Sequence, residues 1–172
     1  MPIREIEVRS LGEFVDVVTP REPDRQTGRW RDTGVYRGAS NAARPLLTSL
    51  DRLGGMDPPF TKLELEEHIL RNFIRYSRPH LEGDRTSDWE LLIAAQHHGV
   101  PTRLLDWSYS PLVAAFFATR PGVNPHDRAI WRLDWQRVHR HFRLAPLALF
   151  MDDLADHLGS RDLTPWKLFA TR

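Results

Sequence analysis

The stretch Gln96-His-His-Gly-Val-Pro-Thr-Arg-Leu-Leu-Asp-Trp107 is the most informative part of the sequence. It contains the end of one predicted helix and the start of the segment that follows. Upstream, Ser87-Asp-Trp-Glu90 has the spacing of a capping box, in which the Ser and Glu side chains each accept an amide hydrogen at a helix start. Gly99 can supply the left-handed residue that ends such a helix, and Pro101 prevents the helix from resuming. We therefore expect residues 102–107 to leave as an extended strand.

Hydrophobic periodicity predicts further elements on both sides of this stretch. Apolar residues at helical spacing indicate helices, and short alternating or glycine-bounded apolar runs indicate strands. Residues 19–33, rich in Pro, Arg, Asp and Gly, are expected to form a surface loop. The predicted helices lie at residues 10–18, 61–76 and 111–119, and the predicted strands at 35–37 and 129–134. Together they predict a single α+β domain over residues 1–172, with a small mixed sheet flanked by helices.

The composition limits what the chain can bind and where it can work. Lys and Arg number 24 and Asp and Glu number 23, so the chain has no general electrostatic reason to bind nucleic acid or an anionic membrane. It contains no cysteine, which excludes disulfides and thiolate metal sites. No apolar run reaches the roughly 18 residues of a membrane span, and the first residues carry charges rather than a signal peptide's apolar stretch. These features predict a cytoplasmic protein.

Arg37 is the first candidate for chemistry, because it lies between Tyr36 and Gly38 at the end of a predicted strand. A guanidinium held rigidly there could bind a phosphate or a carboxylate, and the glycine would let a ligand approach the backbone. The alternative is an ordinary strand-end arginine paired with a carboxylate of the protein. Both interpretations are open at this point.

Two adjacent histidines and a later acidic residue form the second group of candidates. The side chains of His97 and His98 point about 100° apart on a helix, so they cannot easily coordinate the same metal ion, and no metal site is expected. His98 could contact Asp106 or line a ligand pocket, or it could have only a structural role. Arg103 and Asp106 lie three apart on the expected strand and so face opposite sides. Asp106 is a functional candidate if it reaches Arg37, whereas a buried Arg–Asp pair that fixes strand order would explain the same residues.

These motifs resemble the FRG domain, which is named for a Phe/Tyr-Arg-Gly motif. Tyr36-Arg37-Gly38, within residues 35–40, matches that motif, and residues 89–118 match the family's hallmark. The order of an aromatic-Arg-Gly strand, then a Ser-containing turn into a helix, is also similar to the arginine-type ADP-ribosyltransferases. The resemblance implies an ADP-ribosyltransferase-like fold in which Arg37 holds the NAD phosphates and Ser108 and Ser110 shape the nicotinamide site.

The same resemblance implies NAD as a substrate, in a transferase or NAD glycohydrolase reaction with an unknown acceptor. Asp106 is the candidate carboxylate near the ribose. The further candidates for contact with NAD are Tyr36, Gly38, His98 and Arg103. Since FRG domains are associated with bacterial and phage conflict systems, an active domain would act as a toxin or defence effector. The resemblance also implies a later Gln-x-Gly stretch that this chain lacks, so the domain is either truncated at its C-terminus or missing that role.

A second hypothesis is a non-catalytic ligand- or protein-binding domain, in which the same residues stabilise a pocket or an interface. The missing stretch favours this hypothesis, because the resemblance implies a Glu or Gln on a later strand as the third element of the enzyme. The sequence therefore predicts the family and leaves enzyme activity undecided.

Overall fold

The chain divides into two compact units in the computed structural model. Unit 1 comprises Met1–Ala43 and Trp107–Pro146, and unit 2 comprises Arg44–Asp106 and Leu147–Arg172. The structure describes residues 3–23, 25, 28, 30, 32, 34–54, 61–77, 87–120 and 126–143.

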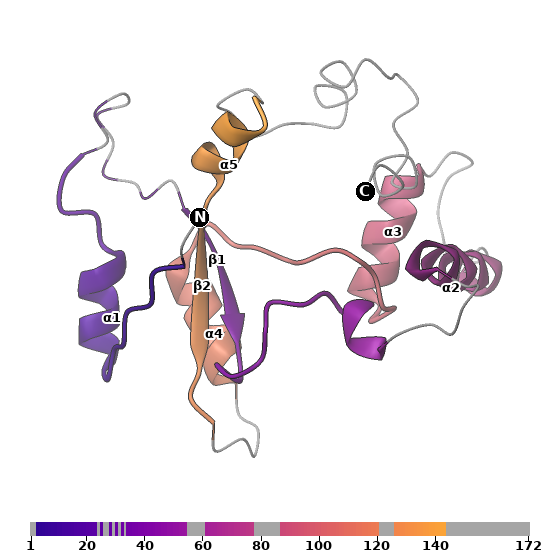
Figure 1. The fold of residues 1–172 in the computed structure, drawn as a ribbon, viewed down its shortest axis with the longest axis horizontal. Helices are drawn as coiled ribbons and strands as arrows, with labels where there is room; N and C mark the ends of the chain where they lie inside the picture. Colours follow the sequence, from indigo (N-terminus) through magenta and orange to yellow (C-terminus); the bar gives the residue numbers. More distant parts are fainter. Residues whose placement is uncertain are drawn as a thin grey trace. The chain divides into compact units, whose positions relative to one another are not determined.

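The described residues form five α-helices, one 3-10 helix and two strands (Figure 1). In chain order these are α1 (Leu11–Val18), β1 (Gly34–Ala39), η1 (Asp51–Leu53), α2 (Lys62–Ser77), α3 (Asp88–His97), α4 (Pro111–Thr119), β2 (Ala129–Asp134) and α5 (Trp135–His141). The predicted α+β class is confirmed. The sheet in the described part of the chain is antiparallel, however, and not mixed.

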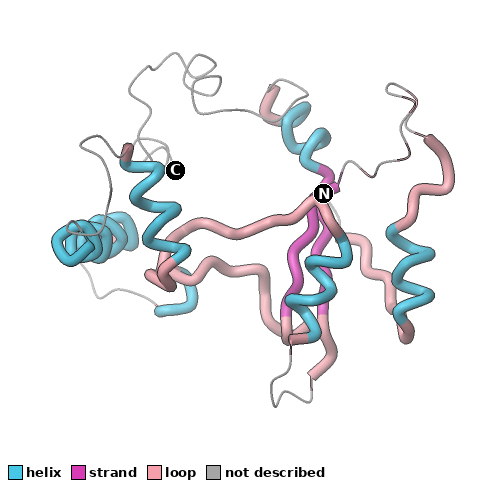
Figure 2. Tube along the Cα trace, turned by 180° about the vertical axis from the view of Figure 1, so that it is seen from behind, coloured by secondary structure: helices cyan, strands magenta, loops and turns pink. Residues whose placement is uncertain are grey.

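Unit 1 is built on the antiparallel pair of β1 and β2, which are in register from Gly34 opposite Asp134 to Ala39 opposite Ala129. Helix α4 covers one face of this sheet, since it lies behind the strands in Figure 1 and in front of them in Figure 2. The other edge of β1 carries an isolated bridge from Tyr36 to Ser108. Strand β1 is therefore flanked on both edges at Tyr36, by β2 and by Ser108.

The contact between α4 and β1 depends on small residues. Ala114 and Ala118 are buried on α4. A Cβ atom at Gly38 of β1 would lie 2.0 Å from the carbonyl oxygen of Ala114 and 2.6 Å from the amide nitrogen of Ala118. Only glycine permits this approach, because the neighbouring atoms belong to the backbone and cannot rotate away.

Unit 2 has its described core between α2 and α3. Leu70 of α2 packs with Leu91 and Ala95 of α3, and this cluster is extended by partly buried Phe73 and Ile74. Ser87 and Glu90 form the predicted capping box at the start of α3, and Gly99 after its end has a φ of 81°. The sequence interpretation of both helix ends is thus confirmed.

Residues 102–107 are not the strand that the sequence predicted. They form a loop, because their polar groups bond to other partners instead of a strand ladder. The carbonyl oxygen of Thr102 accepts hydrogen bonds from the amide of Leu50, at 3.1 Å, and from the hydroxyl of Ser49, at 3.1 Å. The amide of Thr102 in turn donates to Ser49 Oγ at 2.9 Å. The predicted surface loop at 19–33 is described only in part, and the expected C-terminal end of the domain lies outside the described residues.

None of the helices within the described residues has the length and apolar composition of a membrane span. No group of three or more His, Asp or Glu side chains in the same residues is arranged to hold a metal ion.

Candidate functional site

The side chain of Tyr36 is anchored by a charged network that the sequence did not reveal. Its side chain is 1% exposed, and its hydroxyl donates a hydrogen bond to Oδ2 of Asp32. The guanidinium of Arg132, directly opposite Tyr36 on β2, donates to both oxygens of the same carboxylate. The amide of Gly34 completes the set with a bond of 2.9 Å to Oδ1 of Asp32. One carboxylate therefore ties the start of β1 to its own buried tyrosine and to β2.

The electrostatics of this network follow from its hydrogen bonds. Burial alone would raise the pKa of Asp32, but the bonds from Arg132, Tyr36 and Gly34 outweigh it and lower that pKa to about 2. Burial, together with the bond to the Asp32 carboxylate, raises the pKa of Tyr36 to about 12. The same carboxylate raises the pKa of Arg132 further above its ordinary value. All three groups thus keep their neutral-pH charge states throughout the physiological range.

Asp32 is expected to make the stability of the protein depend on acid pH. A carboxyl group whose pKa is lower in the folded state stabilises the fold above its ordinary pKa of 3.8, and the contribution is lost as pH falls through about 2. The free energy of unfolding should therefore differ most between wild type and Asp32→Asn near neutral pH. The difference should shrink steadily below pH 4 or so, as measured by urea denaturation at several pH values.

The comparison between wild type and Asp32→Asn separates the pH-dependent contribution of Asp32 from that of other acidic groups. Asp51, for example, also has a lowered pKa, because Lys62 and Thr48 donate hydrogen bonds to it, and it titrates in both proteins. A difference in unfolding free energy that stays constant from neutral pH down to about pH 2 would contradict the assignment of Asp32.

Ser108 and Ser110 shape the entry into α4. The amide and carbonyl of Tyr36 pair with those of Ser108 at 2.7 and 2.8 Å. The hydroxyl of Ser108 accepts from the amide of Ser110 at 3.0 Å, and Ser110 Oγ caps α4 by accepting from the amide of Val113 at 3.4 Å. The structure therefore places Ser108 beside Tyr36 of β1 and Ser110 at the start of α4, and each hydroxyl makes a local structural hydrogen bond.

Arg37 projects from the opposite face of β1. Side chains alternate along a strand, and Tyr36 and Gly38 both lie on the face that α4 covers. Arg37 is half-buried on the other face, opposite Trp131 of β2. Residues paired directly across an antiparallel ladder share a face, so the side chain of Ser108 lies with Tyr36 rather than with Arg37. The space beside Gly38 is taken by α4, so helix packing accounts for that glycine.

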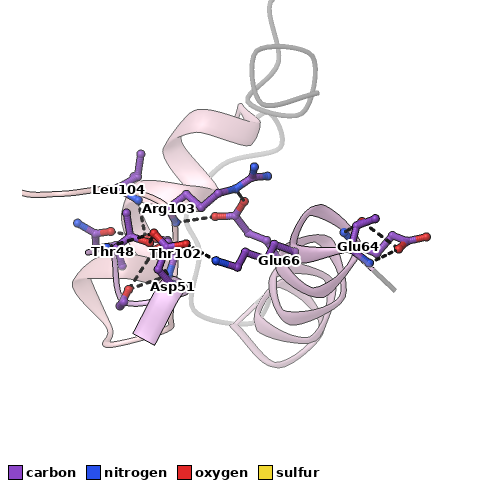
Figure 3. Close-up of polar contacts among 11 residues, drawn as sticks. Thr48, Asp51, Glu64, Glu66, Thr102, Arg103 and Leu104 are labelled. Carbon is purple, nitrogen blue, oxygen red and sulfur yellow. Dashed lines mark hydrogen bonds and ion pairs between the residues drawn. The ribbon is translucent and has the colours of Figure 1, made fainter. Parts of the chain in front are cut away.

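Arg103 in unit 2 pairs with a buried carboxylate that the sequence did not single out (Figure 3). Glu66, on α2 and 1% exposed, accepts from the backbone amide of Arg103 at 2.7 Å and from its Nε at 2.6 Å. This Arg–Glu pair fixes the loop that carries Arg103 on helix α2. A signal existed, since Glu66 lies on the same face of α2 as Ile69, Leu70 and Phe73.

Gln96 ties the two ends of the hallmark loop together. Its Oε1 accepts from the hydroxyl of Thr102, and its Nε2 donates to Oδ1 of Asp106 at 2.6 Å. The hydroxyl of Thr102 also accepts from the amide of Leu104 at 3.3 Å. Asp106 itself is exposed to solvent. The amide side chain of Gln96 thus uses both its donor and its acceptor to hold the loop that follows α3.

The paired histidines lie at the exposed end of α3. His98 is the C-cap residue, with its ring centroid 6.1 Å from that of Phe73 and 5.6 Å from that of His97. The predicted site residues thus fall into two sets. Arg37, Ser108 and Ser110 belong to unit 1, and His98, Arg103 and Asp106 belong to unit 2.

Neither Asp32 nor Glu66 was predicted from the sequence as the partner of a motif residue. Asp32 stands in the stretch expected to be only a surface loop, and nothing nearby in the sequence marks it as the partner of Tyr36 and Arg132. Its one local signal is its place two residues before a strand, where an Asp side chain can bond to a nearby backbone amide.

The fold and the anchored strand define a small α+β domain organised around a Tyr-Arg-Gly segment and a Gln-to-Asp loop. The family model described as FRG domain matches residues 32–128, which is more than half of the chain. This protein belongs to the FRG domain family. The matched region begins at Asp32, the carboxylate that holds Tyr36, and it ends before β2. Comparisons with curated proteins and with solved structures gave no match.

Proposed function

We propose that this FRG domain binds NAD through Arg37 and cleaves it, releasing nicotinamide. The observation that carries the proposal is the fixation of Tyr36 and Gly38, one by the Asp32 network and the other by α4. Arg37 stands between these two fixed residues, so the place of its backbone on the sheet is set before any ligand arrives. A guanidinium carried there is well suited to the two negative charges of a pyrophosphate.

The proposed reaction breaks the bond between the nicotinamide nitrogen and C1 of the ribose. Nicotinamide leaves with the bonding electrons and becomes neutral. The oxygen of water, or an oxygen or nitrogen of an acceptor, forms the new bond to C1 and loses a proton. The transition state resembles a ribosyl cation and is stabilised by nearby negative or polar groups. The order of strand, Ser-containing turn and helix, similar to that of the arginine-type ADP-ribosyltransferases, supports this chemistry.

Substitution of Arg37 tests the proposal directly. Arg37→Ala should lower nicotinamide release from NAD by about 100-fold or more, because a fixed charge on the pyrophosphate is lost. Arg37→Lys should restore only part of this, since lysine lacks the bidentate geometry. The matched control is Arg137→Ala, which removes an exposed arginine of the same unit and should leave the rate unchanged. Nicotinamide is measured by chromatography, and folding of each variant by circular dichroism.

Equal release by wild type and a folded Arg37→Ala variant would contradict the NAD proposal altogether.

A role as a toxin or defence effector is the biological extension of this proposal. It rests on the association of FRG domains with bacterial and phage conflict systems. Expression of the wild type in a bacterial host should slow growth, and Arg37→Ala should relieve the effect at equal protein level. Equal growth with both proteins would count against an effector.

The second candidate function is binding of a ligand or a protein without turnover. One observation favours it, namely that Ser108, Ser110 and Asp106 are each occupied by a local hydrogen bond that holds a helix start or a loop. Another is the exposed apolar surface of α4, formed by Leu112, Val113, Phe116 and Phe117, which is typical of interaction surfaces. NAD binding by calorimetry together with no release of nicotinamide would select this candidate.

A further inference from the structure

The face of the sheet opposite α4 has a composition that suits a nucleotide. Strand alternation places Val35, Arg37 and Ala39 of β1 on this face, and their partners across the ladder are Leu133, Trp131 and Ala129 of β2. Arg37 is the one charged side chain among these six, and Trp131 is the one aromatic side chain. The two lie directly opposite each other, where Cβ atoms are about 5 Å apart in antiparallel sheets.

The residues of this face remain partly exposed to solvent. Leu133 is 37% exposed. Val35, Arg37, Ala39, Ala129 and Trp131 are all half-buried. The indole of Trp131 is thus partly held by its neighbours and partly open to solvent. A half-buried aromatic ring can receive a flat ligand at little entropic cost, because few of its rotamers remain to be lost.

We infer that Trp131 is the residue on which a ring of the dinucleotide stacks while Arg37 receives its phosphate. The inference rests on the proposed function of Arg37 and adds a second binding residue to it. A guanidinium recognises phosphate oxygens, and a tryptophan offers the largest aromatic surface for stacking on a base. Phosphate and ring belong to the same nucleotide, so two neighbouring side chains can contact both. Trp131 lies beyond the residues matched by the family model, so this site is completed by β2 of this chain.

The ligand chemistry required is an aromatic ring joined to a phosphate, and NAD contains two such halves. AMP carries the adenine half and nicotinamide mononucleotide carries the other. Inorganic pyrophosphate carries the charge without any ring. The three probes therefore separate stacking on adenine, stacking on nicotinamide and the electrostatic contribution of Arg37.

The experiment measures binding of NAD and the three probes by calorimetry to full-length wild type, Trp131→Ala, Trp131→Phe and Arg37→Ala. Trp131→Ala should weaken NAD binding by about tenfold or more, and Trp131→Phe, which keeps an aromatic ring, should restore most of it. Pyrophosphate should bind wild type and Trp131→Ala equally, because the guanidinium is unchanged. Leu133→Ala is the matched control, since it shortens a side chain on the same face and strand. Quenching of tryptophan fluorescence by NAD should also diminish in Trp131→Phe although NAD still binds.

Each other outcome has a definite meaning. If NAD binds in an Arg37-dependent manner with the same affinity in Trp131→Ala, the stacking inference is overturned and the proposed function stands. If Trp131→Ala weakens NAD and pyrophosphate equally, Trp131 only supports the guanidinium, and the stacking inference again fails. If wild type binds neither NAD nor any of the probes, both the inference and the proposed function are overturned.

Discussion

Replacement of Gly38 with alanine is expected to destabilise the protein by more than about 3 kcal/mol. The new Cβ would lie 2.0 Å from the carbonyl oxygen of Ala114 and 2.6 Å from the amide nitrogen of Ala118. Neither backbone atom can move without shifting α4 away from β1, which would expose the buried side of both elements. Urea denaturation followed by circular dichroism would show a lower midpoint or a protein that is unfolded at the outset.

Gly12→Ala is the matched control for this prediction. Gly12 lies in α1, and the nearest atom to its added Cβ would be Ser10 Oγ at 3.9 Å, which is ordinary contact. Alanine in a helix is favoured over glycine, so this variant should be more stable than wild type by about 0.5 kcal/mol. A Gly38→Ala variant as stable as Gly12→Ala would show that α4 does not pack on β1 as described.

Glu66→Ala is expected to destabilise the protein by about 3 kcal/mol. The change removes both acceptors used by Arg103, one for its backbone amide and one for its Nε. The guanidinium and the backbone amide of Arg103 would then lack the hydrogen-bond acceptor that replaces the water they lose on burial. The loop that carries the hallmark residues would lose its attachment to α2. Equilibrium denaturation of wild type and variant gives the difference in unfolding free energy.

The neighbouring Glu67 provides the matched control on the same helix. Glu67 pairs with Arg71 at 3.3 Å on the surface, where ion pairs contribute little, so Glu67→Ala should cost less than about 0.5 kcal/mol. Glu66→Gln should fall between the two, because an amide keeps one acceptor for Arg103 and loses the charge. A Glu66→Ala variant as stable as Glu67→Ala would refute the anchoring role of the buried carboxylate.

The hallmark of this family member is explained largely by structural hydrogen bonds in unit 2. Gln96 joins Thr102 to Asp106, Thr102 bonds to Ser49 and Leu50, and Arg103 reaches Glu66. A loop that lacks a strand ladder must satisfy its backbone groups in this way. These structural hydrogen bonds therefore require particular residues in the loop, whether or not those residues take part in catalysis.

The sequence alone indicated most of the helices and both described strands of this protein, together with its family. Local signals were enough for the capping box at Ser87 and the left-handed stop at Gly99, because each depends on residues within one helical turn. The Tyr-Arg-Gly and Gln-to-Trp motifs likewise indicated the FRG domain, which the family match confirmed.

Contacts between side chains that are distant in the sequence became known only from the tertiary structure. The extended stretch after Gly99 could equally have been a strand or a loop, and its partners in α2, α3 and residues 49–50 made it a loop. Asp32 and Arg132 are 100 positions apart in the chain, so no local pattern could pair them. The pairing of Arg37 with Trp131 similarly depends on the register of two distant strands. Short-range periodicity reports the conformation of a segment, whereas a binding site depends on long-range packing that brings separate segments together.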